Sequence, residues 1–356
     1  MHLDIQETKY KELSIKLPVL IFGAGKFAQD LCTILVNKNF KVLGFCQTEV
    51  KEDRVLGLPV FKLSEIETFD DYQVVLGVFN RETPFGALVD QLPDKMNVFF
   101  LWEIYTQFEQ EFGWRYWLSN PNTILDNKTQ INEVYNILQD SRSRFCLEHI
   151  CKFRLGSDLL YGNYRDVENQ YFNNITLDPF KFKAINYLDA GAYNGDSFKN
   201  LLAYSRTNNA YLFEPGKNNY KELCQNVVEE NVMCFPLAVA DENKIISFNS
   251  EAGEASSILD NGKDSIAAVA LDDLFAHISI DFIKLDIEGA ESLAIKGLEK
   301  TIKTQKPVIA MSLYHKPKDI FELPNAILNI DNNYSLYIRQ HYYNSFDCVL
   351  YAVPRL

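Results

Sequence analysis

Small and polar residues follow two apolar segments of the sequence, at positions where buried strands would end. In "YLDAGAYNGDS", Asp189 is followed by Gly191 and Gly195, and in "DFIKLDIEGAE", Asp286 is followed by Glu288. Glycine allows a positive φ and a close approach of the backbone to a ligand. In open parallel sheets, ligands bind where a strand delivers such a turn to a helix N-terminus. We therefore predict a ligand site at these two segments.

The acids around the first turn indicate which kind of ligand it binds. Glu214 ends the next apolar run, "YLFEP", about 25 residues after Asp189, where a carboxylate can accept hydrogen bonds from both hydroxyls of a ribose. A dinucleotide would bring a pyrophosphate and a GxGxxG turn, whereas this turn is Gly-Ala-Tyr-Asn-Gly followed by Asp196. Acids repel phosphate but attract the ammonium and sulfonium groups of S-adenosylmethionine, which we predict as the cofactor.

Three residues could remove a proton from an acceptor hydroxyl: Asp286, Glu288 and His315. His315 ends the fifth apolar run in "SLYHKP", and the ordinary pKa of histidine suits a base near neutral pH. Glu288 could equally be an acid favoured by a helix N-terminus, and His341 is a weaker second candidate. The same three side chains could hold a Mg²⁺-type ion. One histidine and two acids, without further ligands, are weak evidence for such a metal site. We assign no metal and keep this set as the alternative.

Alternating strands and helices must position these residues. From residue 185 onward the sequence predicts a sheet with strands at 185–190, 210–214, 233–238, 281–286 and 307–313, and a β-rich insertion between the third and fourth. "YSLYIRQ" and "DCVLYAV" are too close in sequence for a parallel crossover, so they should form an antiparallel hairpin. This is the architecture of class I S-adenosylmethionine-dependent methyltransferases. Lys284 is expected to point the other way along its strand, into a buried salt bridge.

A second α/β unit precedes this one. "PVLIFGAGKFAQDLCTILVNKNFKVLGFC" indicates strand, glycine turn, helix and strand, and further strands are predicted at 72–79 and 97–102. The second strand ends at Cys46 without the acid that NAD needs, and the nearest acid is Glu49. The unit could be an empty structural domain, a nucleotide-sugar site or an NAD(P) site. The residues that could bind a nucleotide or sugar here are Gly23, Gly25, Lys26, Asn80 and Arg81.

The fold class that follows is α/β, with two Rossmann-like doubly wound domains and an antiparallel last strand in the second. The predicted domains are residues 1–105, which are Rossmann-like, and residues 183–356, which are of the methyltransferase type. Residues 106–182 form a predicted helical connector or cap. The connector is assigned from apolar residues at helical spacing, namely Ile131, Val134, Ile137 and Leu138.

Residues 140 to 356 resemble the FkbM family of methyltransferases. "YLDAGAYNGDS", "LFEP", "ALDDL" and "IKLDIEGAE" are similar to its motifs, as are "DSRSRF", "FRLG", "QYF" and "SLYHKPKDIFELP". The resemblance implies a class I fold, S-adenosylmethionine as donor and, usually, O-methylation of a sugar or another small metabolite. In the first domain, "VLGFCQTEV", "VLGLPVFKL" and "LGVFNRETP" look similar to the N-terminal domain of bacterial sugar O-acyltransferases. That domain binds a nucleotide sugar without redox chemistry.

The expected cofactor-binding residues lie in the turns and loops after the strands of the second domain. Asp189 could instead cap its own turn, and Asp241 could be an ordinary loop acid rather than a partner of the adenine amino group. Ser256 and Ser257 belong to "EASSIL", where the family has small polar residues near the cofactor. The full set is Asp189, Gly191, Tyr193, Gly195, Asp196, Ser197, Glu214, Asp241, Ser257 and Asp286.

Composition narrows the other classes of function. The chain has 356 residues and a formal net charge of −13, which disfavours a nucleic-acid partner, and no run approaches the ~20 apolar residues of a membrane span. The N-terminal segment lacks the apolar core of a signal peptide, and the seven cysteines are scattered. We expect a cytoplasmic enzyme, able to form homo-oligomers, that acts on a small-molecule or saccharide substrate, nucleotide-linked or not. Two alternatives stay open: a nucleotide-sugar-binding scaffold with an inactive methyltransferase domain, and an NAD-dependent oxidoreductase.

Overall fold

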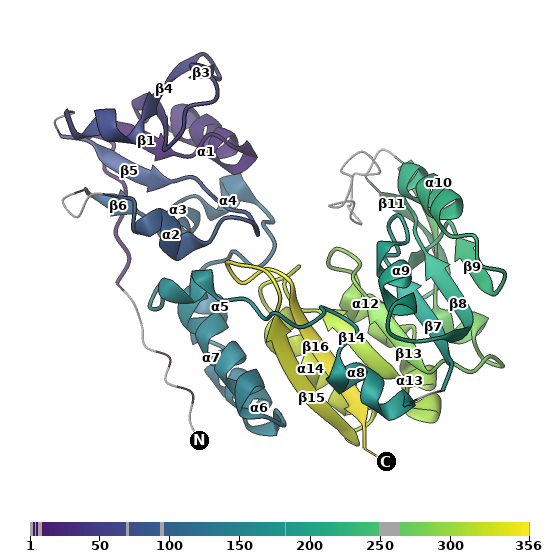
Figure 1. The fold of residues 1–356 in the computed structure, drawn as a ribbon. Coiled ribbons are helices and arrows are strands. Elements are labelled where there is room, and N and C mark those ends of the chain that lie inside the picture. Colours follow the sequence, from purple (N-terminus) through teal and green to yellow (C-terminus); the bar gives the residue numbers. More distant parts are fainter. Residues whose placement is uncertain are drawn as a thin grey trace.

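The computed structural model describes residues 3, 5, 9–68, 71–92, 96–181, 183–248 and 264–355. Two α/β domains are joined by a helical connector (Figure 1). Among the described residues, no helix is long and apolar enough to cross a membrane.

The N-terminal domain contains a six-stranded sheet with the order β3-β4-β2-β1-β5-β6. Neighbouring strands are parallel, except that β3 is antiparallel to β4. Every residue of β1 and β5 is buried, which explains why all of their residues except Gln73 are apolar. The strands are β1 Val19–Phe22, β2 Val42–Gln47, β3 Arg54–Val55, β4 Leu58–Lys62, β5 Gln73–Leu76 and β6 Val98–Phe99. The helices are α1 Lys26–Asn37, the 3-10 helix η1 Leu63–Thr68 and α2 Phe85–Val89.

The C-terminal domain contains a seven-stranded sheet with the order β15-β16-β14-β13-β7-β8-β9. β16 is antiparallel to both β14 and β15, and the other pairs are parallel. The predicted doubly wound sheet, its antiparallel last strand and the final hairpin are therefore confirmed. The strands are β7 Ile185–Ala190, β8 Thr207–Phe213, β9 Val232–Phe235, β13 Phe282–Leu285, β14 Val308–Ser312, β15 Tyr334–Gln340 and β16 Cys348–Pro354.

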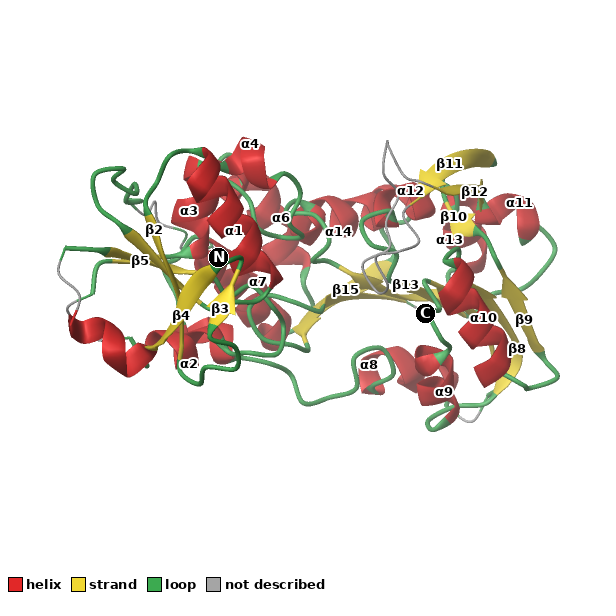
Figure 2. Cartoon of the chain, turned by 90° about the horizontal axis from the view of Figure 1, so that it is seen from above, coloured by secondary structure: helices red, strands yellow, loops and turns green. Residues whose placement is uncertain are grey.

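Helices cover both faces of this sheet, with α8 and α9 on one face and α12, α13 and α14 on the other (Figure 2). Their bounds are α8 Asn174–Leu177, α9 Asp196–Leu202, α10 Lys217–Asn226, α11 Leu271–Leu274, α12 Glu291–Lys296, α13 Glu299–Gln305 and α14 Asp319–Ile330. The β-rich insertion is a small sheet of β10 Ala238–Val239, β11 Lys244–Phe248 and β12 Asp264–Val269. Ser256 and Ser257 lie outside the described residues.

The last strand of the N-terminal sheet is shorter than its sequence suggested. The strand predicted at 97–102 is only β6, and α3 (Leu101–Gln107) follows it directly. The cause is a helix cap: the Glu103 carboxylate accepts a hydrogen bond from the backbone N–H of Phe100 at 2.9 Å. A short apolar run does not distinguish a buried strand from the first turn of a buried helix.

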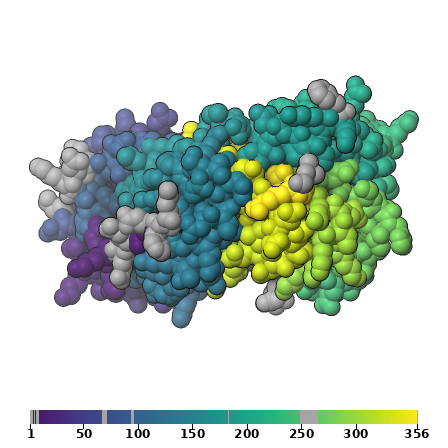
Figure 3. Space-filling model, turned by 90° about the horizontal axis from the view of Figure 1, so that it is seen from below, coloured from purple at the N-terminus to yellow at the C-terminus, as the bar shows by residue number. Residues whose placement is uncertain are grey.

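The later connector helices, α6 (Lys128–Ile137) and α7 (Ser141–Arg154), pack onto the C-terminal domain. Backbone N–H of Gln139 donates to the carbonyl of Leu336 in β15 at 3.0 Å, and Ser143 Oγ accepts from the N–H of Ile338 at 3.0 Å. The earlier helix α4 (Glu109–Phe112) instead contacts α1 of the N-terminal domain, where Phe112 stacks on Phe27. Viewed from below, the teal connector lies between the N-terminal domain and the yellow final strands (Figure 3). Its remaining elements are α5 Asn122–Leu125, η2 Leu160–Asn163 and η3 Asp178–Phe180.

The loop between β15 and β16, residues 341–347, reaches the N-terminal domain (Figure 1). The side-chain amide of Asn344 donates to the carbonyls of Asn80 and Thr83, each at 2.7 Å. The amide oxygen accepts from the N–H of Phe85 at 2.8 Å. The final hairpin is therefore fastened to the loop that follows β5.

Candidate functional site

A cavity of about 680 Å³ opens where the two domains meet, a volume in the range of small-molecule sites. One part of its wall consists of predicted cofactor residues: Gly191, Tyr193, Asp196, Ser197, Glu214 and Asp286. Another part consists of aromatic rings: Phe79, Tyr116, Tyr171, Tyr314, Tyr342 and Phe346. The N-terminal domain contributes residues 79–82. Residues from both domains and from the connector therefore share one space.

The turn after β7 is formed by residues with positive φ. Gly191 has φ +82°, and a Cβ there would lie 1.8 Å from the backbone oxygen of Asp286. The two segments singled out in the sequence thus touch, and only glycine allows the contact. Gly195 has φ +89°, and a Cβ there would lie 2.6 Å from Val227 Cγ2. Tyr193, between them, also has a positive φ of 48°.

Glu214 follows β8 and is 5% exposed. Its Oε2 accepts from the N–H of Tyr193 at 3.0 Å, and its Oε1 accepts from the N–H of Gly216 at 2.8 Å. Burial raises the pKa of Glu214, and these N–H donors oppose the shift. The carboxylate is therefore held at the mouth of the turn, on the wall of the cavity.

Asp189 is fully buried behind the turn. It accepts hydrogen bonds from the hydroxyls of Tyr187 at 2.9 Å and Ser197 at 2.5 Å, and its Oδ1 lies 2.8 Å from Lys284 Nζ. Burial would lower the pKa of Lys284, but the Asp189 carboxylate outweighs it and raises the pKa. Asp189 does not line the cavity, and its contacts are those of the alternative reading, an acid that fixes its own turn.

The predicted salt bridge of Lys284 is present, but its predicted direction is wrong. Lys284 pairs in register with Asp189 across β13 and β7. It also lines the cavity, as Asp286 does. Residues two apart in a strand share a face, so alternation places these two side chains on the same side.

Asp286 follows β13 and holds a defined orientation. Its Oδ2 accepts from the hydroxyl of Tyr171 and its Oδ1 from the hydroxyl of Ser312, both at 2.8 Å. Burial raises its pKa, but His315, Lys284 and these hydroxyls together hold the pKa below its usual value. Asp286 is therefore a carboxylate across the physiological range.

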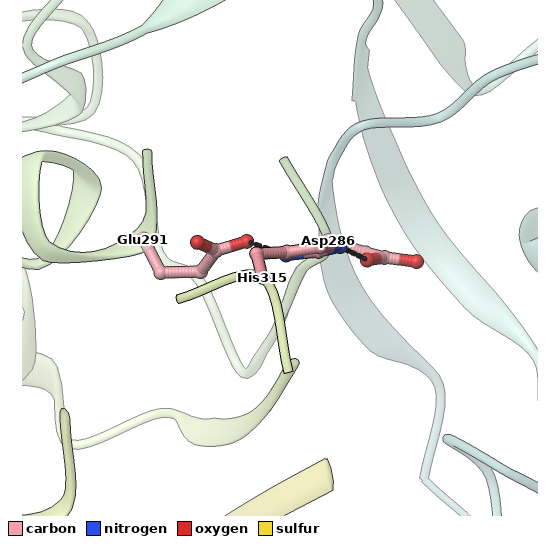
Figure 4. Close-up of side chains that lie close together, drawn as sticks. All are labelled: Asp286, Glu291 and His315. Atoms are coloured by element: carbon pink, nitrogen blue, oxygen red, sulfur yellow. Dashed lines mark hydrogen bonds and ion pairs between the residues drawn. The ribbon is translucent and has the colours of Figure 1, made fainter. Parts of the chain in front are cut away.

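His315 lies between two carboxylates, as Figure 4 shows. Nδ1 is 2.7 Å from Glu291 Oε1, and Nε2 is 3.3 Å from Asp286 Oδ1. The residue is fully buried and does not line the cavity. Burial would lower the pKa of His315, but Glu291 and Glu288 raise it well above its usual value. The ring is therefore an imidazolium that balances the surrounding acids.

Glu288 lines the cavity in a strained backbone conformation, with φ +52°. Its Oε1 is 3.6 Å from His315 Nε2, and its side chain is 16% exposed. Its Oε2 is buried and has no hydrogen-bond partner within the described part of the chain. Burial raises the pKa of Glu288 to about 8, and the nearby charge of Asp286 adds to the increase.

One cluster has the composition of a metal site: Asp286, Glu291 and His315 offer ligand atoms within 4.8 Å of one another. The set considered from the sequence contained Glu288 in place of Glu291. In the observed arrangement the two ring nitrogens face different carboxylates, so no single nitrogen faces the whole cluster. The metal-free assignment stays our prediction.

Several predicted residues do not line this cavity. Asp241 forms an ion pair with Lys244 at 2.9 Å, and His341 Nε2 is 2.6 Å from the hydroxyl of Tyr351. Burial lowers the pKa of His341 to about 4. In the N-terminal domain, Asn80 and Arg81 line the cavity, whereas Gly23, Gly25 and Lys26 do not. Lys26 instead pairs with Asp30 on its own helix at 2.8 Å.

Three residues of this region were not predicted as site residues from the sequence: Tyr171, Glu291 and Asp347. Tyr171 and Glu291 hold Asp286 and His315 in place. Asp347 lines the cavity from the final hairpin. The turn of that hairpin, "NSFD", has three polar residues around Phe346, which was the only sequence signal for Asp347.

Residues 189–338 match the family model of the methyltransferase FkbM domain. A crystal structure of a methyltransferase FkbM from Methylobacillus flagellatus KT superposes with a TM-score of 0.73 at 19% identity, covering 94% of this chain and 89% of that chain. At this identity the likeness concerns the fold, and it extends over both domains. A precorrin-6y C5,15-methyltransferase from Geobacter metallireducens GS-15 gives a TM-score of 0.32 at 12% identity, covering 51% of this chain and 86% of that chain. No curated protein matches the sequence. The likeness of the first domain to sugar O-acyltransferases stays a prediction.

Proposed function

We propose that this chain, through its FkbM methyltransferase domain, transfers a methyl group from S-adenosylmethionine to a hydroxyl of a sugar or another small metabolite. The observation that supports this most directly is the shared cavity. Its wall contains the turn at Gly191, the carboxylate of Glu214 and the carboxylates of Asp286 and Glu288. The residues that we assign to the nucleoside and to proton removal therefore line one space.

For the cofactor, Glu214 is the residue that we assign to the ribose hydroxyls. Its carboxylate lines the cavity and is fixed by two backbone N–H groups. Leu237 and Val239 offer apolar surface for the adenine ring on the same side. Asp196 and Asp286 supply negative charge for the ammonium and sulfonium groups. Asp189 acts indirectly, because its side chain fixes the turn and does not contact the ligand.

For the reaction, we assign proton removal to Glu288. When bound, S-adenosylmethionine supplies a methyl group on a positively charged sulfur. The cavity wall must hold the acceptor oxygen in line with that methyl group, and such positioning contributes much of the rate. As the O–C bond forms and the C–S bond breaks, the hydroxyl proton passes to Glu288. Glu288 suits this role better than Asp286, because its pKa of about 8 gives it the greater affinity for a proton.

His315 is a positioning residue in this scheme and not the base that its sequence position suggested. Its imidazolium contacts Asp286, Glu288 and Glu291 from behind the cavity wall. It keeps Asp286 ionised and fixes where both carboxylates point.

The cofactor assignment is tested by calorimetry with S-adenosylhomocysteine. Glu214→Ala should weaken binding by about 1–3 kcal/mol, because a charge-assisted hydrogen-bond pair is lost. Glu222→Ala is the matched control, since Glu222 is an exposed acid of α10, and it should bind like the wild type. Unchanged affinity in Glu214→Ala would remove Glu214 from the site, and a wild type that does not bind would refute the proposed function.

A further inference from the structure

A second buried carboxylate, that of Asp347 in the loop between β15 and β16, also lines the cavity. Its side chain is 4% exposed, and its Oδ1 is 3.7 Å from Nη1 of Arg81 in the N-terminal domain. Oδ1 also accepts a hydrogen bond from Gln170 Nε2 at 3.0 Å. Oδ2 is buried and has no hydrogen-bond partner among the residues that the structure describes. Such an atom is costly unless a ligand donates to it.

The loop that carries Asp347 is strained. Asn344, Ser345 and Asp347 all have positive φ, at 59°, 62° and 47°. Non-glycine residues in this region persist only where their surroundings impose them, and they gather at ligand sites. Here the surroundings are those of the N-terminal domain, since Asn344 binds the backbone of residues 80–85. The position of Asp347 therefore depends on both domains.

Hydrogen bonds connect Asp347 to the reacting end of the cavity. Gln170 Nε2 donates to Asp347 Oδ1 and, at 2.9 Å, to the hydroxyl of Tyr171. That hydroxyl donates to Asp286 Oδ2 at 2.8 Å. A group bound to Asp347 would thus be placed on the same wall as the carboxylates that flank the predicted methyl group.

The chemistry of this part of the wall indicates what it binds. The aromatic residues Tyr116, Tyr314, Tyr342 and Phe346 line the same cavity as the acids Asp286, Glu288 and Asp347. The cation that the N-terminal domain contributes, Arg81, lies near Asp347 and 5.1 Å from the ring of Tyr342. Aromatic faces suit the C–H surface of a sugar ring, and carboxylates accept its hydroxyl hydrogens. A phosphate would instead be repelled by several acids at close range.

We propose that Asp347 binds a hydroxyl group of an uncharged sugar ring, in an acceptor subsite that the N-terminal domain completes through Arg81. The inference rests on the proposed function and narrows it, because it disfavours nucleoside diphosphate sugars as acceptors. It also assigns the contribution of the N-terminal domain to substrate binding to the loop after β5, and not to the glycine turn at residues 23–26.

The ionisation of Asp347 agrees with this role. Burial raises the pKa of Asp347 to about 6, against the lowering effect of Arg81. Above that pH the side chain is a carboxylate, which accepts hydrogen bonds from hydroxyl groups.

The test uses the full chain saturated with S-adenosylhomocysteine, at about pH 8. Calorimetry and saturation-transfer NMR would compare the neutral methyl glycosides of glucose, galactose, mannose, fucose and rhamnose with UDP-glucose and GDP-mannose. At least one neutral glycoside should bind, and no nucleotide sugar should bind more tightly. Asp347→Ala should weaken that binding by about 13- to 160-fold, the range for a lost hydrogen bond to a charged group. Asp347→Asn, which keeps an acceptor oxygen, should weaken it less.

Two further variants test the contribution of the N-terminal domain. Arg81→Met should weaken glycoside binding without changing the Kd of S-adenosylhomocysteine. Lys26→Ala, in the glycine turn, should change neither. The proposal is overturned if no neutral glycoside binds, if a nucleotide sugar binds more tightly, or if both Asp347 variants bind the glycoside like the wild type. Cofactor binding in the same samples separates these results from a failure of the proposed function.

Discussion

Glu288 combines features that are unfavourable for folding and useful for a base. Its backbone is left-handed, one carboxylate oxygen has no partner among the described residues, and its pKa is about 8. A non-glycine residue in this conformation costs roughly 1–2 kcal/mol. The fold tolerates this cost at a position that lines the cavity, which is where strained residues most often have a function.

The pH dependence of turnover should therefore follow Glu288. In the wild type, kcat should rise with pH and level off above about 8, because the base must be ionised to accept a proton. Glu288→Gln should lower kcat by about 10²- to 10⁴-fold, the range for a lost general base, with little change in cofactor affinity. Stopped assays with labelled cofactor over a pH series would measure both. A flat pH profile would assign proton removal elsewhere.

Stability gives an independent check on the same side chain. A folded-state pKa of about 8, above the ordinary 4.5, means that the native state holds the proton more tightly than the unfolded state. The resulting stabilisation is present below the unfolded pKa and is lost as pH rises through about 8. Glu288→Gln cannot ionise, so its Tm should exceed that of the wild type above this pH. Added EDTA should alter neither the Tm nor the turnover of the wild type. A loss of turnover with EDTA would instead support the metal alternative.

The buried pair of Lys284 and Asp189 should contribute strongly to stability. Asp189→Asn leaves the Lys284 ammonium buried without its partner, which should cost about 3–5 kcal/mol of unfolding free energy in urea titrations. Asp241→Asn breaks the partly exposed pair with Lys244 and should cost about 0–1 kcal/mol. Equal losses in the two variants would contradict the assignment of Asp189 as the acid that fixes the turn.

At the scale of elements, the turn after β7 and the turn after β13 depend on each other. Gly191→Ala would place a Cβ 1.8 Å from the Asp286 backbone oxygen, so one turn must move. We expect a lower Tm and weaker binding of S-adenosylhomocysteine, measured by thermal denaturation and calorimetry. Gly113→Ala is the matched control, since Gly113 also has a positive φ but no atom within 4 Å of the added Cβ. If the two variants behave alike, crowding between the turns is not the reason for the glycine.

The sequence allows prediction of those parts of the site that follow parallel strands. Asp189 lies near the end of β7, Glu214 and Asp286 directly follow β8 and β13, and parallel strands bring such ends to one edge of the sheet. Which acid faces the ligand is not predictable in this way. Asp189 is turned away by its pairing with Lys284 in the neighbouring strand, a contact between residues 95 positions apart.

Asp347 could not be predicted as a site residue from the sequence, for a different reason. It lies in the turn of an antiparallel hairpin, and its side chain enters the cavity only because the loop is docked on the N-terminal domain. The raised pKa of Glu288 and the imidazolium of His315 likewise depend on acids that come together only in the folded chain. The end of a strand can be recognised from a short stretch of sequence. The docking of a loop and the balance of buried charges depend on residues that are far apart in the chain.

At the scale of the whole molecule, Asn344 fastens the two halves of the cavity together. Asn344→Ala removes its contacts with residues 80–85, so the loop after β5 should open more often. Hydrogen exchange should quicken in peptides that cover residues 79–86 and 341–347, since local opening controls exchange there. Asn333→Ala is the control, because Asn333 hydrogen-bonds Arg355 near the end of the chain. Unchanged exchange at 79–86 would mean that other contacts hold the domains.

The contacts of Asn344 with the N-terminal domain have an evolutionary implication. Its amide group recognises only main-chain atoms, namely the carbonyls of Asn80 and Thr83 and the N–H of Phe85. Any loop that follows the same path would keep these hydrogen bonds, whatever side chains it presents at positions 81 and 82. The Arg81 side chain adds its own contacts with Asp347 and Tyr342, but the hydrogen bonds of Asn344 do not depend on it, so both positions are open to selection for new substrates. A library randomised at both would be a direct route to enzymes with altered acceptor preference on an unchanged scaffold.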